Sequence, residues 1–201
     1  APLLGWATVL ILLPPSEGKT DPVGGAPLDL GALSFPELTV PRRRVLEAVG
    51  RLAAGPRRRA RTVLGLSERQ DAEIERDAWL TVAATAPAGH VYSGVLFDAL
   101  GYPTLPGRAR DRADRWVVVS SGLFGAVCLP DPIPAYRLSG DVRLPRLGRL
   151  TTFWRPFLDT SLSERGGSGI VLDLRSSSYA ASWTPSGSVA GRTIVARVMQ
   201  R

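Results

Sequence analysis

The stretch WVVVSSGLFG, Trp116–Gly125, indicates the fold most clearly. Its first half is apolar and β-branched, which is typical of a buried strand, and its second half is a turn of small residues. Two other short apolar runs, Val9–Leu13 and residues 169–174, have the same character and also predict buried strands. We therefore predict a single mixed α/β domain whose central mixed sheet is flanked by helices.

The segments around these strands predict several helices and one further strand. Apolar residues recur there at helical spacing, and Gly, Pro and Ser mark the turns. The expected helices cover residues 43–54, 57–64, 68–80, 95–100 and 150–162, and the last strand covers residues 192–199. The domain is expected to span residues 9–201, with residues 1–8 as an extension or a cloning remnant.

The composition bounds the function. The chain has 201 residues and a formal net charge of +7, and its apolar runs are too short for a membrane span. One cysteine, Cys128, and one histidine, His90, cannot form an internal disulfide or a His/Cys metal site. We expect a cytoplasmic protein with no metal, no cofactor and no membrane partner. The sequence does not give the oligomeric state, and a monomer is favoured. We also expect Cys128 to be a small buried hydrophobe rather than a peroxide sensor.

Polar segments follow each of the three predicted strands. PPSEGKT follows the first, SSGLFG the second and RSSSY the third. Since ligands of α/β sheets bind beyond the carboxyl ends of the strands, we expect these segments to line one basic cleft, together with AYRL at residues 135–138. The side chains expected to share this cleft are Ser16, Glu17, Lys19, Ser121, Arg137, Asp173, Arg175 and Ser178.

Lys19 belongs to the triplet GKT, which also ends a Walker A phosphate loop. The rest of that motif is missing, because a leucine stands where its first glycine belongs and two prolines remove N–H donors. Lys19 is nevertheless the only lysine among 25 basic residues. Beside Ser16 and Glu17, it can serve as a nucleophile or general base if burial lowers its pKa. Alternatively, it forms a structural salt bridge with Glu17.

The charges are segregated along the chain. Arginines gather in residues 42–61 and again in residues 137–155, whereas acidic residues concentrate in residues 68–78. One interpretation is that the protein binds a polyanion, since arginine neutralises phosphates. The other is that the protein comes from a proteome rich in arginine.

Residues 57–80 are a candidate helix–hairpin–helix segment, with two short helices around Gly65. Ser67 begins the second helix in the Ser-x-x-Gln form of the capping box. In such a hairpin the free N–H groups of the turn face a phosphate, whereas in an ordinary αα-corner they do not. The residues expected to contact DNA in this segment are Arg58, Arg59, Arg61 and Gly65.

Four stretches in this order resemble the YaaA family of bacterial peroxide stress proteins. They are LILLPPSEGKT, VYSGVLFDAL, VVVSSGLFGAVCLPDPIPAYRL and VLDLRSSSYAASW, and together they cover residues 9–183. The resemblance implies a basic cleft, binding to double-stranded or distorted DNA, and protection from peroxide by limiting damage from iron. It places the family's helix–hairpin–helix on residues 58–79, its opening-loop lysine on Lys19, and its Tyr-Arg pair on Tyr136 and Arg137.

Three hypotheses about function remain open at this point. The first is a DNA-binding protein of the oxidative stress response, which holds a phosphate-rich ligand in the basic cleft. The second is an enzyme that acts on a nucleotide or nucleobase in the same cleft, with Lys19, Glu17 and Ser16 as its catalytic residues. The third is an interaction module whose basic face meets an acidic protein.

Overall fold

The computed structural model describes residues 9–196. The extension expected at residues 1–8 and the end of the strand expected at residues 192–199 therefore lie outside the described residues. No helix within residues 9–196 is both long and apolar enough to cross a membrane.

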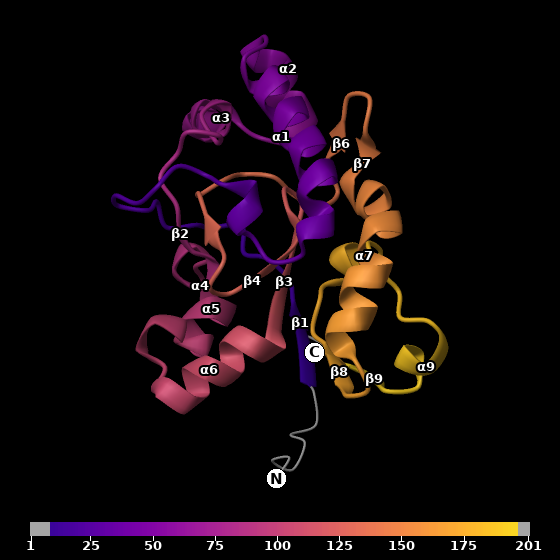
Figure 1. Ribbon diagram of the computed structural model, residues 1–201. Helices are drawn as coiled ribbons and strands as arrows, with labels where there is room; N and C mark the ends of the chain where they lie inside the picture. The colour runs from indigo at the N-terminus through magenta and orange to yellow at the C-terminus, as the bar shows by residue number, and fades with distance from the viewer. Residues whose placement is uncertain (1–8, 197–201) are drawn as a thin grey trace, which may run out of the picture.

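A five-stranded mixed sheet forms the centre of the molecule (Figure 1). Its strand order is β4-β3-β1-β8-β9. The strands β3, β1, β8 and β9 run parallel, and β4 pairs antiparallel with β3 at one edge. Their bounds are β1 Val9–Leu13, β3 Val117–Ser121, β4 Gly125–Cys128, β8 Ile170–Asp173 and β9 Thr193–Val195. The predicted mixed α/β fold with a central mixed sheet is confirmed.

The three strands predicted from apolar runs are neighbours in this sheet. Ile11 of β1 pairs with Val117 of β3 on one side and with Leu172 of β8 on the other. Parallel strands need cover on both faces, and this requirement explains why their sequences are almost continuously apolar. The carboxyl ends of β1, β3 and β8 meet at the same edge of the sheet, as the sequence predicts.

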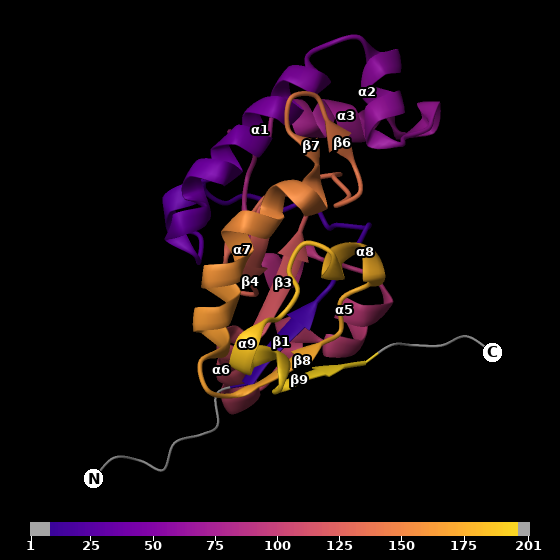
Figure 2. The ribbon, with the colours of Figure 1, turned by 90° about the vertical axis from the view of Figure 1, so that its right-hand side faces the viewer.

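Helices cover both faces of the sheet. The long helix α7 packs on one face, against β1 and β4, and α6 packs on the other, against β1 and β3 (Figures 1 and 2). The α-helices are α1 Thr39–Ala53, α2 Arg57–Leu64, α3 Asp71–Ala78, α4 Ala88–Val91, α5 Val95–Leu100, α6 Gly107–Trp116, α7 Leu150–Gly166, α8 Ser177–Ala180 and α9 Gly187–Ala190. Two small antiparallel pairs complete the fold, β2 Ala86–Pro87 with β5 Pro132–Ile133, and the β6–β7 hairpin of Arg143–Leu144 with Gly148–Arg149.

Each of the five expected helices has a counterpart in the structure. The helices expected at residues 57–64 and 95–100 have those bounds, whereas α1 begins before the expected residue 43, α3 is shorter than the expected 68–80, and α7 continues beyond residue 162. The sequence analysis did not predict α6 or the short helices α4, α8 and α9. Helix α6, GRARDRADRW, buries only Ala113, so it lacks the apolar stripe on which the other helix predictions depend.

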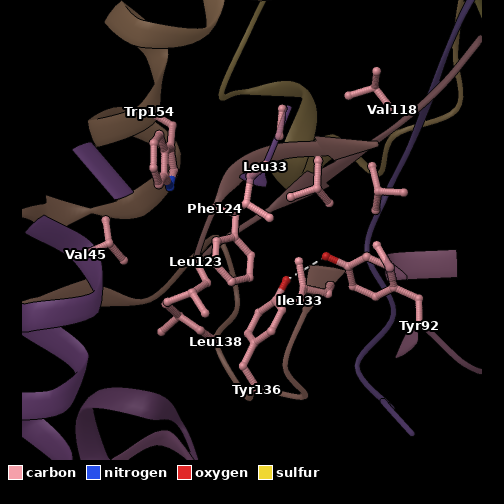
Figure 3. Packing of buried hydrophobic residues seen from close by; sticks show 14 of the residues in the cluster. Leu33, Val45, Tyr92, Val118, Leu123, Phe124, Ile133, Tyr136, Leu138 and Trp154 are labelled. Carbon is pink, nitrogen blue, oxygen red and sulfur yellow. Dashed lines mark hydrogen bonds between the residues drawn. The ribbon is translucent and has the colours of Figure 1, made fainter. Parts of the chain in front are cut away.

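The small residues of SSGLFG allow close packing at the end of β3. Gly125 has a φ of 76°, and a Cβ atom there would lie 2.7 Å from the Trp154 ring. The Trp154 indole donates a hydrogen bond to the carbonyl of Gly122 at 2.9 Å. Figure 3 shows this core, where Trp154, Phe124 and Tyr136 pack with aliphatic side chains. The turn therefore lets the Trp154 ring pack directly against the backbone of residues 122–125.

Two residues from the sequence analysis lie inside the core. Arg42, from the first arginine cluster, is fully buried and donates to the carbonyls of Phe124 and Ala126 at 3.1 and 2.7 Å. One member of this cluster therefore holds the fold instead of facing a polyanion. Cys128 is 2% exposed and burial raises its pKa, so the thiolate that reacts with peroxide is disfavoured.

Candidate functional site

A cavity of about 200 Å³ opens where β1 ends. Its wall comes from four parts of the chain that are distant in sequence: the loop after β1, the last turn of α2 at Gly65, residues 137–139, and Tyr179 of α8. Three of the segments predicted to form the cleft therefore contribute to the wall, namely PPSEGKT, AYRL and RSSSY. The fourth, SSGLFG, lies beneath it in the core.

The loop after β1 is attached to residues 91–93. The N–H of Thr20 donates to the carbonyl of Val91 at 2.8 Å, and Lys19 forms an isolated bridge with Tyr92. The Ser16 hydroxyl accepts a hydrogen bond from the N–H of Ser93 at 3.1 Å and donates to the carbonyl of Gly18. These contacts fix the backbone of Lys19, so its side chain has a defined direction into the cavity.

The ammonium of Lys19 lies in an unusual environment for a lysine. It donates to the carbonyl of Ser16 at 2.9 Å and lies 4.1 Å from the centroid of the Tyr136 ring. Burial, reinforced by the nearby positive charge of Arg137, lowers the pKa of Lys19 from 10.5 to about 7. A substantial fraction of Lys19 is therefore an uncharged amine at neutral pH.

Arg137 lies at the rim of the same cavity. Its guanidinium binds the carboxylate of Glu17 at 2.9 Å and the carbonyl of Glu17 at 3.2 Å. The Glu17 side chain is 87% exposed, and such exposed ion pairs are weak. The salt bridge expected between Lys19 and Glu17 is wrong, since Glu17 pairs with Arg137 instead. An anion that enters the cavity can thus compete with Glu17 for Arg137.

Asp77 at the end of α3 supports this rim from inside. Its Oδ1 accepts a hydrogen bond from the N–H of Arg137 at 3.0 Å, whereas its buried Oδ2 has no partner among the described residues. Burial raises the pKa of Asp77 from 3.8 to about 7, and the positive charge of Lys19 opposes that rise. The two groups therefore influence each other's protonation.

A chain of hydroxyl groups lies below the cavity. The Tyr136 hydroxyl is 2.7 Å from the Ser121 hydroxyl and 2.9 Å from the Tyr92 hydroxyl, as Figure 3 shows for the two tyrosines. All three residues are buried. Ser121 and Tyr136, both predicted to bind ligand, thus support Lys19 from below and do not line the cavity.

Arg175 and Ser178 also lie outside the cavity lining. The buried guanidinium of Arg175 forms a double hydrogen bond with Asp173 at 2.7 and 2.9 Å and donates to the carbonyl of Trp183 at 2.8 Å. Its hydrogen-bonding capacity therefore serves the fold. Ser178 donates to Asp141 at the surface. The RSSSY segment reaches the cavity through Tyr179, which the sequence analysis did not select as a site residue.

Residues 57–80 contain two short helices around Gly65, which has a φ of 69° and ends α2. The predicted Ser-x-x-Gln capping box begins the second helix. Arg61 binds both carboxylate oxygens of Asp71 at 2.7 Å, so the acidic residues of this segment neutralise one of its arginines. Whether this segment contacts DNA stays a prediction.

Arg58 and Arg59 are exposed on α2, away from the Lys19 cavity. Arg59 lines a second hollow, of about 220 Å³, together with Arg51 of α1 and Arg146 of the β6–β7 hairpin. The hairpin lies beside α2 in both views (Figures 1 and 2). The fold therefore brings together members of the two arginine clusters that are about ninety residues apart in sequence. Within residues 9–196, neither Arg59 nor Arg146 forms an ion pair with a carboxylate.

Arg146 has a backbone conformation that arginine rarely adopts. Its φ is 68°, in the left-handed region, at the third position of a turn that begins at Leu144. Glycine or asparagine is the usual residue at that position of a turn after proline. For a residue other than glycine this conformation costs on the order of 1–3 kcal/mol. Sequence alone could have raised this point, because PR replaces the usual PG or PN.

The comparisons with known proteins all point to one family. The family profile described as peroxide stress protein YaaA matches residues 9–201. The chain is 49% identical over 191 residues to a UPF0246 protein of Streptomyces coelicolor, an alignment that covers 95% of this chain and 74% of that relative. UPF0246 proteins of Corynebacterium glutamicum and Corynebacterium efficiens are 43% and 42% identical, each over 85% of this chain and 68% of the relative.

Proposed function

Because the chain belongs to the YaaA family of peroxide stress proteins, we propose that it acts in the peroxide stress response by binding DNA through its arginines. One observation supports this proposal above the others. Arg59 and Arg146 line a single hollow, and neither has a carboxylate partner within residues 9–196. Exposed guanidinium groups without counter-charges suit phosphates, because binding releases the counterions of the nucleic acid.

Helix α2 connects this hollow to the Lys19 cavity. Pro56 and Arg59 near the start of α2 line the hollow, and Gly65 after its end lines the cavity. The eight residues of α2 extend about 12 Å, a length over which a duplex presents roughly seven phosphates. A duplex lying along α2 is therefore long enough to contact both features at once. In this arrangement Arg137 faces a phosphate at the cavity rim.

The proposal is tested by the salt dependence of duplex binding, measured by fluorescence anisotropy. The affinity should fall steeply between about 50 and 200 mM salt, and the double variant Arg59→Ala/Arg146→Gly should lower the slope of log affinity against log salt by about two. Arg108→Ala and Arg112→Ala on α6 remove the same charge at the opposite end of the molecule and should leave the slope nearly unchanged (Figures 1 and 2). A duplex affinity that does not depend on salt contradicts the proposal.

A second candidate function is an enzyme that acts on a nucleotide or nucleobase in the Lys19 cavity. The observation in its favour is the lowered pKa of Lys19 in a cavity that also contains Arg137. Such perturbed groups in a cavity are typical of catalytic sites. This candidate predicts turnover of a bound nucleotide, which is lost in Lys19→Gln while the variant stays folded.

A further inference from the structure

The chemistry of the Lys19 cavity differs from that of an ordinary anion site. Every other basic residue of the chain is an arginine, and arginine is the better ligand for phosphate because its planar fork binds two oxygens. An arginine cannot lose its proton near neutral pH, whereas a lysine in a desolvated site can. The one lysine of the sequence has its partly buried ammonium in a cavity that also contains the guanidinium of Arg137.

The surroundings of Lys19 hold its nitrogen but do not block it. Among the described residues its hydrogen bond goes to the carbonyl of Ser16, and no carboxylate pairs with it. The Tyr136 ring covers one side at 4.1 Å from the centroid, and the loop after β1 is fixed by its contacts with residues 91–93. The remaining direction is the cavity itself. A fixed amine with one open direction is the geometry that a nucleophile requires.

The size of the cavity indicates what it accepts. A volume of about 200 Å³ is below the roughly 300–1,000 Å³ of sites for drug-sized ligands. It suits a group such as a sugar phosphate better than a whole nucleotide. Arg137 at the rim supplies the positive charge that binds a phosphate. Among the described residues its guanidinium forms an ion pair with the exposed carboxylate of Glu17 alone.

We propose that Lys19 forms an imine with an aldehyde that lies next to a phosphate, while Arg137 binds that phosphate. This inference deepens the proposed function, and it rests on that function only for the source of the aldehyde. In DNA the sources are sugars that have lost their base, and outside DNA they are small phosphorylated aldehydes. Both present the same two groups to the cavity.

The reaction balances with the groups present. The uncharged amine of Lys19 attacks the aldehyde carbon, the carbonyl bond breaks, and a proton moves from nitrogen to oxygen to give a carbinolamine. Loss of the hydroxyl group as water then gives the imine, so the sum is amine plus aldehyde to imine plus water. No oxidant, reductant or metal takes part. The step needs a lysine that is uncharged, and the burial of Lys19 provides one at neutral pH.

The experiment is reductive trapping with borohydride, which converts the imine into a stable secondary amine. In one arm the full chain is mixed with a labelled duplex that carries a single abasic site, and in the other with glyceraldehyde 3-phosphate. A duplex with a tetrahydrofuran analogue, which has no aldehyde, is the chemical control. Adducts are located by peptide mass spectrometry, which separates Lys19 from the amino terminus because the chain has no other primary amine.

An adduct on Lys19 in either arm supports the proposal, and the arm that gives it identifies the source of the aldehyde. Lys19→Arg and Lys19→Gln should each lower its yield at least about tenfold, and Arg108→Ala should leave it unchanged. An adduct only on the amino terminus, or no adduct in either arm, overturns the imine. In that case salt-dependent duplex binding still stands by itself. Conversely, trapping of glyceraldehyde 3-phosphate without duplex binding keeps the imine and overturns the DNA proposal.

Discussion

The ammonium of Lys19 lies 4.1 Å from the centre of the Tyr136 ring, and the hydroxyl of that ring bonds to Ser121 and Tyr92 in the core. Two segments of the family pattern, GKT and AYRL, are thus joined by one aromatic ring. The ring gives the ammonium a favourable face, whereas the burial of Lys19 by its surroundings as a whole removes water from the ammonium. The second effect is the larger, because the pKa of Lys19 falls.

Lys19 and Asp77 should give the free energy of unfolding a minimum near pH 7. Folded Lys19 loses its proton at about 7 and the unfolded side chain at 10.5, so the unfolded state binds more protons between these values and stability rises with pH. Folded Asp77 has a pKa of about 7 against 3.8 unfolded, so its contribution is complete below pH 3.8 and is lost as pH rises to 7. Each slope is at most about 1.4 kcal/mol per pH unit.

Urea unfolding at a series of pH values checks this prediction. Lys19→Met should remove the rise above pH 7, and Asp77→Asn should remove the fall below it. The charged neighbours that face Lys19 are Arg137, Arg76, Asp77 and Glu73, so each variant also shifts the midpoint of the remaining limb. Parallel stability curves for the wild type and both variants would contradict the lowered and raised pKa values.

Arg146→Gly should weaken duplex binding without destabilising the fold. Glycine adopts the left-handed conformation of this position freely, which relieves strain of about 1 kcal/mol, but it also increases the entropy of the unfolded chain by a similar amount. Stability should therefore change by less than about 1 kcal/mol, whereas the salt slope of binding should fall by about one. Thermal unfolding and anisotropy on the same sample separate the two effects. A large loss of stability with unchanged binding would assign Arg146 a structural role.

Glu17→Gln should strengthen anion binding in the cavity. Glu17 occupies Arg137 through an exposed ion pair and places a negative charge at the rim, so its removal frees the guanidinium and abolishes repulsion. We expect the affinity for inorganic phosphate to rise about two- to tenfold at low salt, and less at high salt because of screening. Isothermal titration measures it, with Glu47→Gln on α1 as a control of equal charge. A lower affinity in Glu17→Gln would mean that Glu17 itself contacts the ligand.

The sequence predicted the elements of this site better than their roles. Apolar runs identify β1, β3 and β8, and parallel pairing then brings their polar ends to one edge. Lys19 and Arg137 follow from that logic. The depth of a side chain does not, because it depends on which helices cover the edge. For this reason Arg175 and Arg42, both in basic segments, appear in the core, where each guanidinium nitrogen donates to a carbonyl or to Asp173.

Asp77 and Arg146 were missed for different reasons. Asp77 lies within an acidic run that predicts an exposed helix face, and only the packing of α3 buries this one carboxylate. Arg146 lies in the second arginine cluster, but its meeting with Arg59 requires the β6–β7 hairpin to lie beside α2. Neither the burial of Asp77 nor the proximity of Arg146 to Arg59 can be predicted from the local spacing of residues in the sequence.

Arg175→Met should lower stability by about 3–5 kcal/mol, because it leaves the buried carboxylate of Asp173 without its partner. The duplex salt slope should not change, since the guanidinium already binds Asp173 and two carbonyls. Asp173→Leu together with Arg175→Met should recover much of the loss, because the unpaired charge is then absent. Chemical denaturation of both variants and of Asp173→Leu alone completes the cycle. If Arg175→Met is as stable as the wild type but has a reduced salt slope of duplex binding, then Arg175 contacts DNA and the structural role is wrong.

Tyr136→Phe and Tyr136→Leu should separate the ring from its hydroxyl. Phenylalanine keeps the face below Lys19 but leaves the buried Tyr92 hydroxyl without its partner, at a cost of about 1–3 kcal/mol in stability. Leucine also removes the ring, so the ammonium loses the closer of its two cation–π contacts and the pKa of Lys19 should fall by up to about one unit.

The Cε resonance of isotopically labelled lysine reports this titration directly, since the chain has a single lysine. Tyr136→Phe should titrate as the wild type does, and Tyr136→Leu should titrate at lower pH. If both variants shift equally, the hydroxyl chain controls Lys19 and the ring does not. If neither shifts, the desolvation that lowers the pKa of Lys19 comes from the loop after β1 and from α3, and not from the Tyr136 ring.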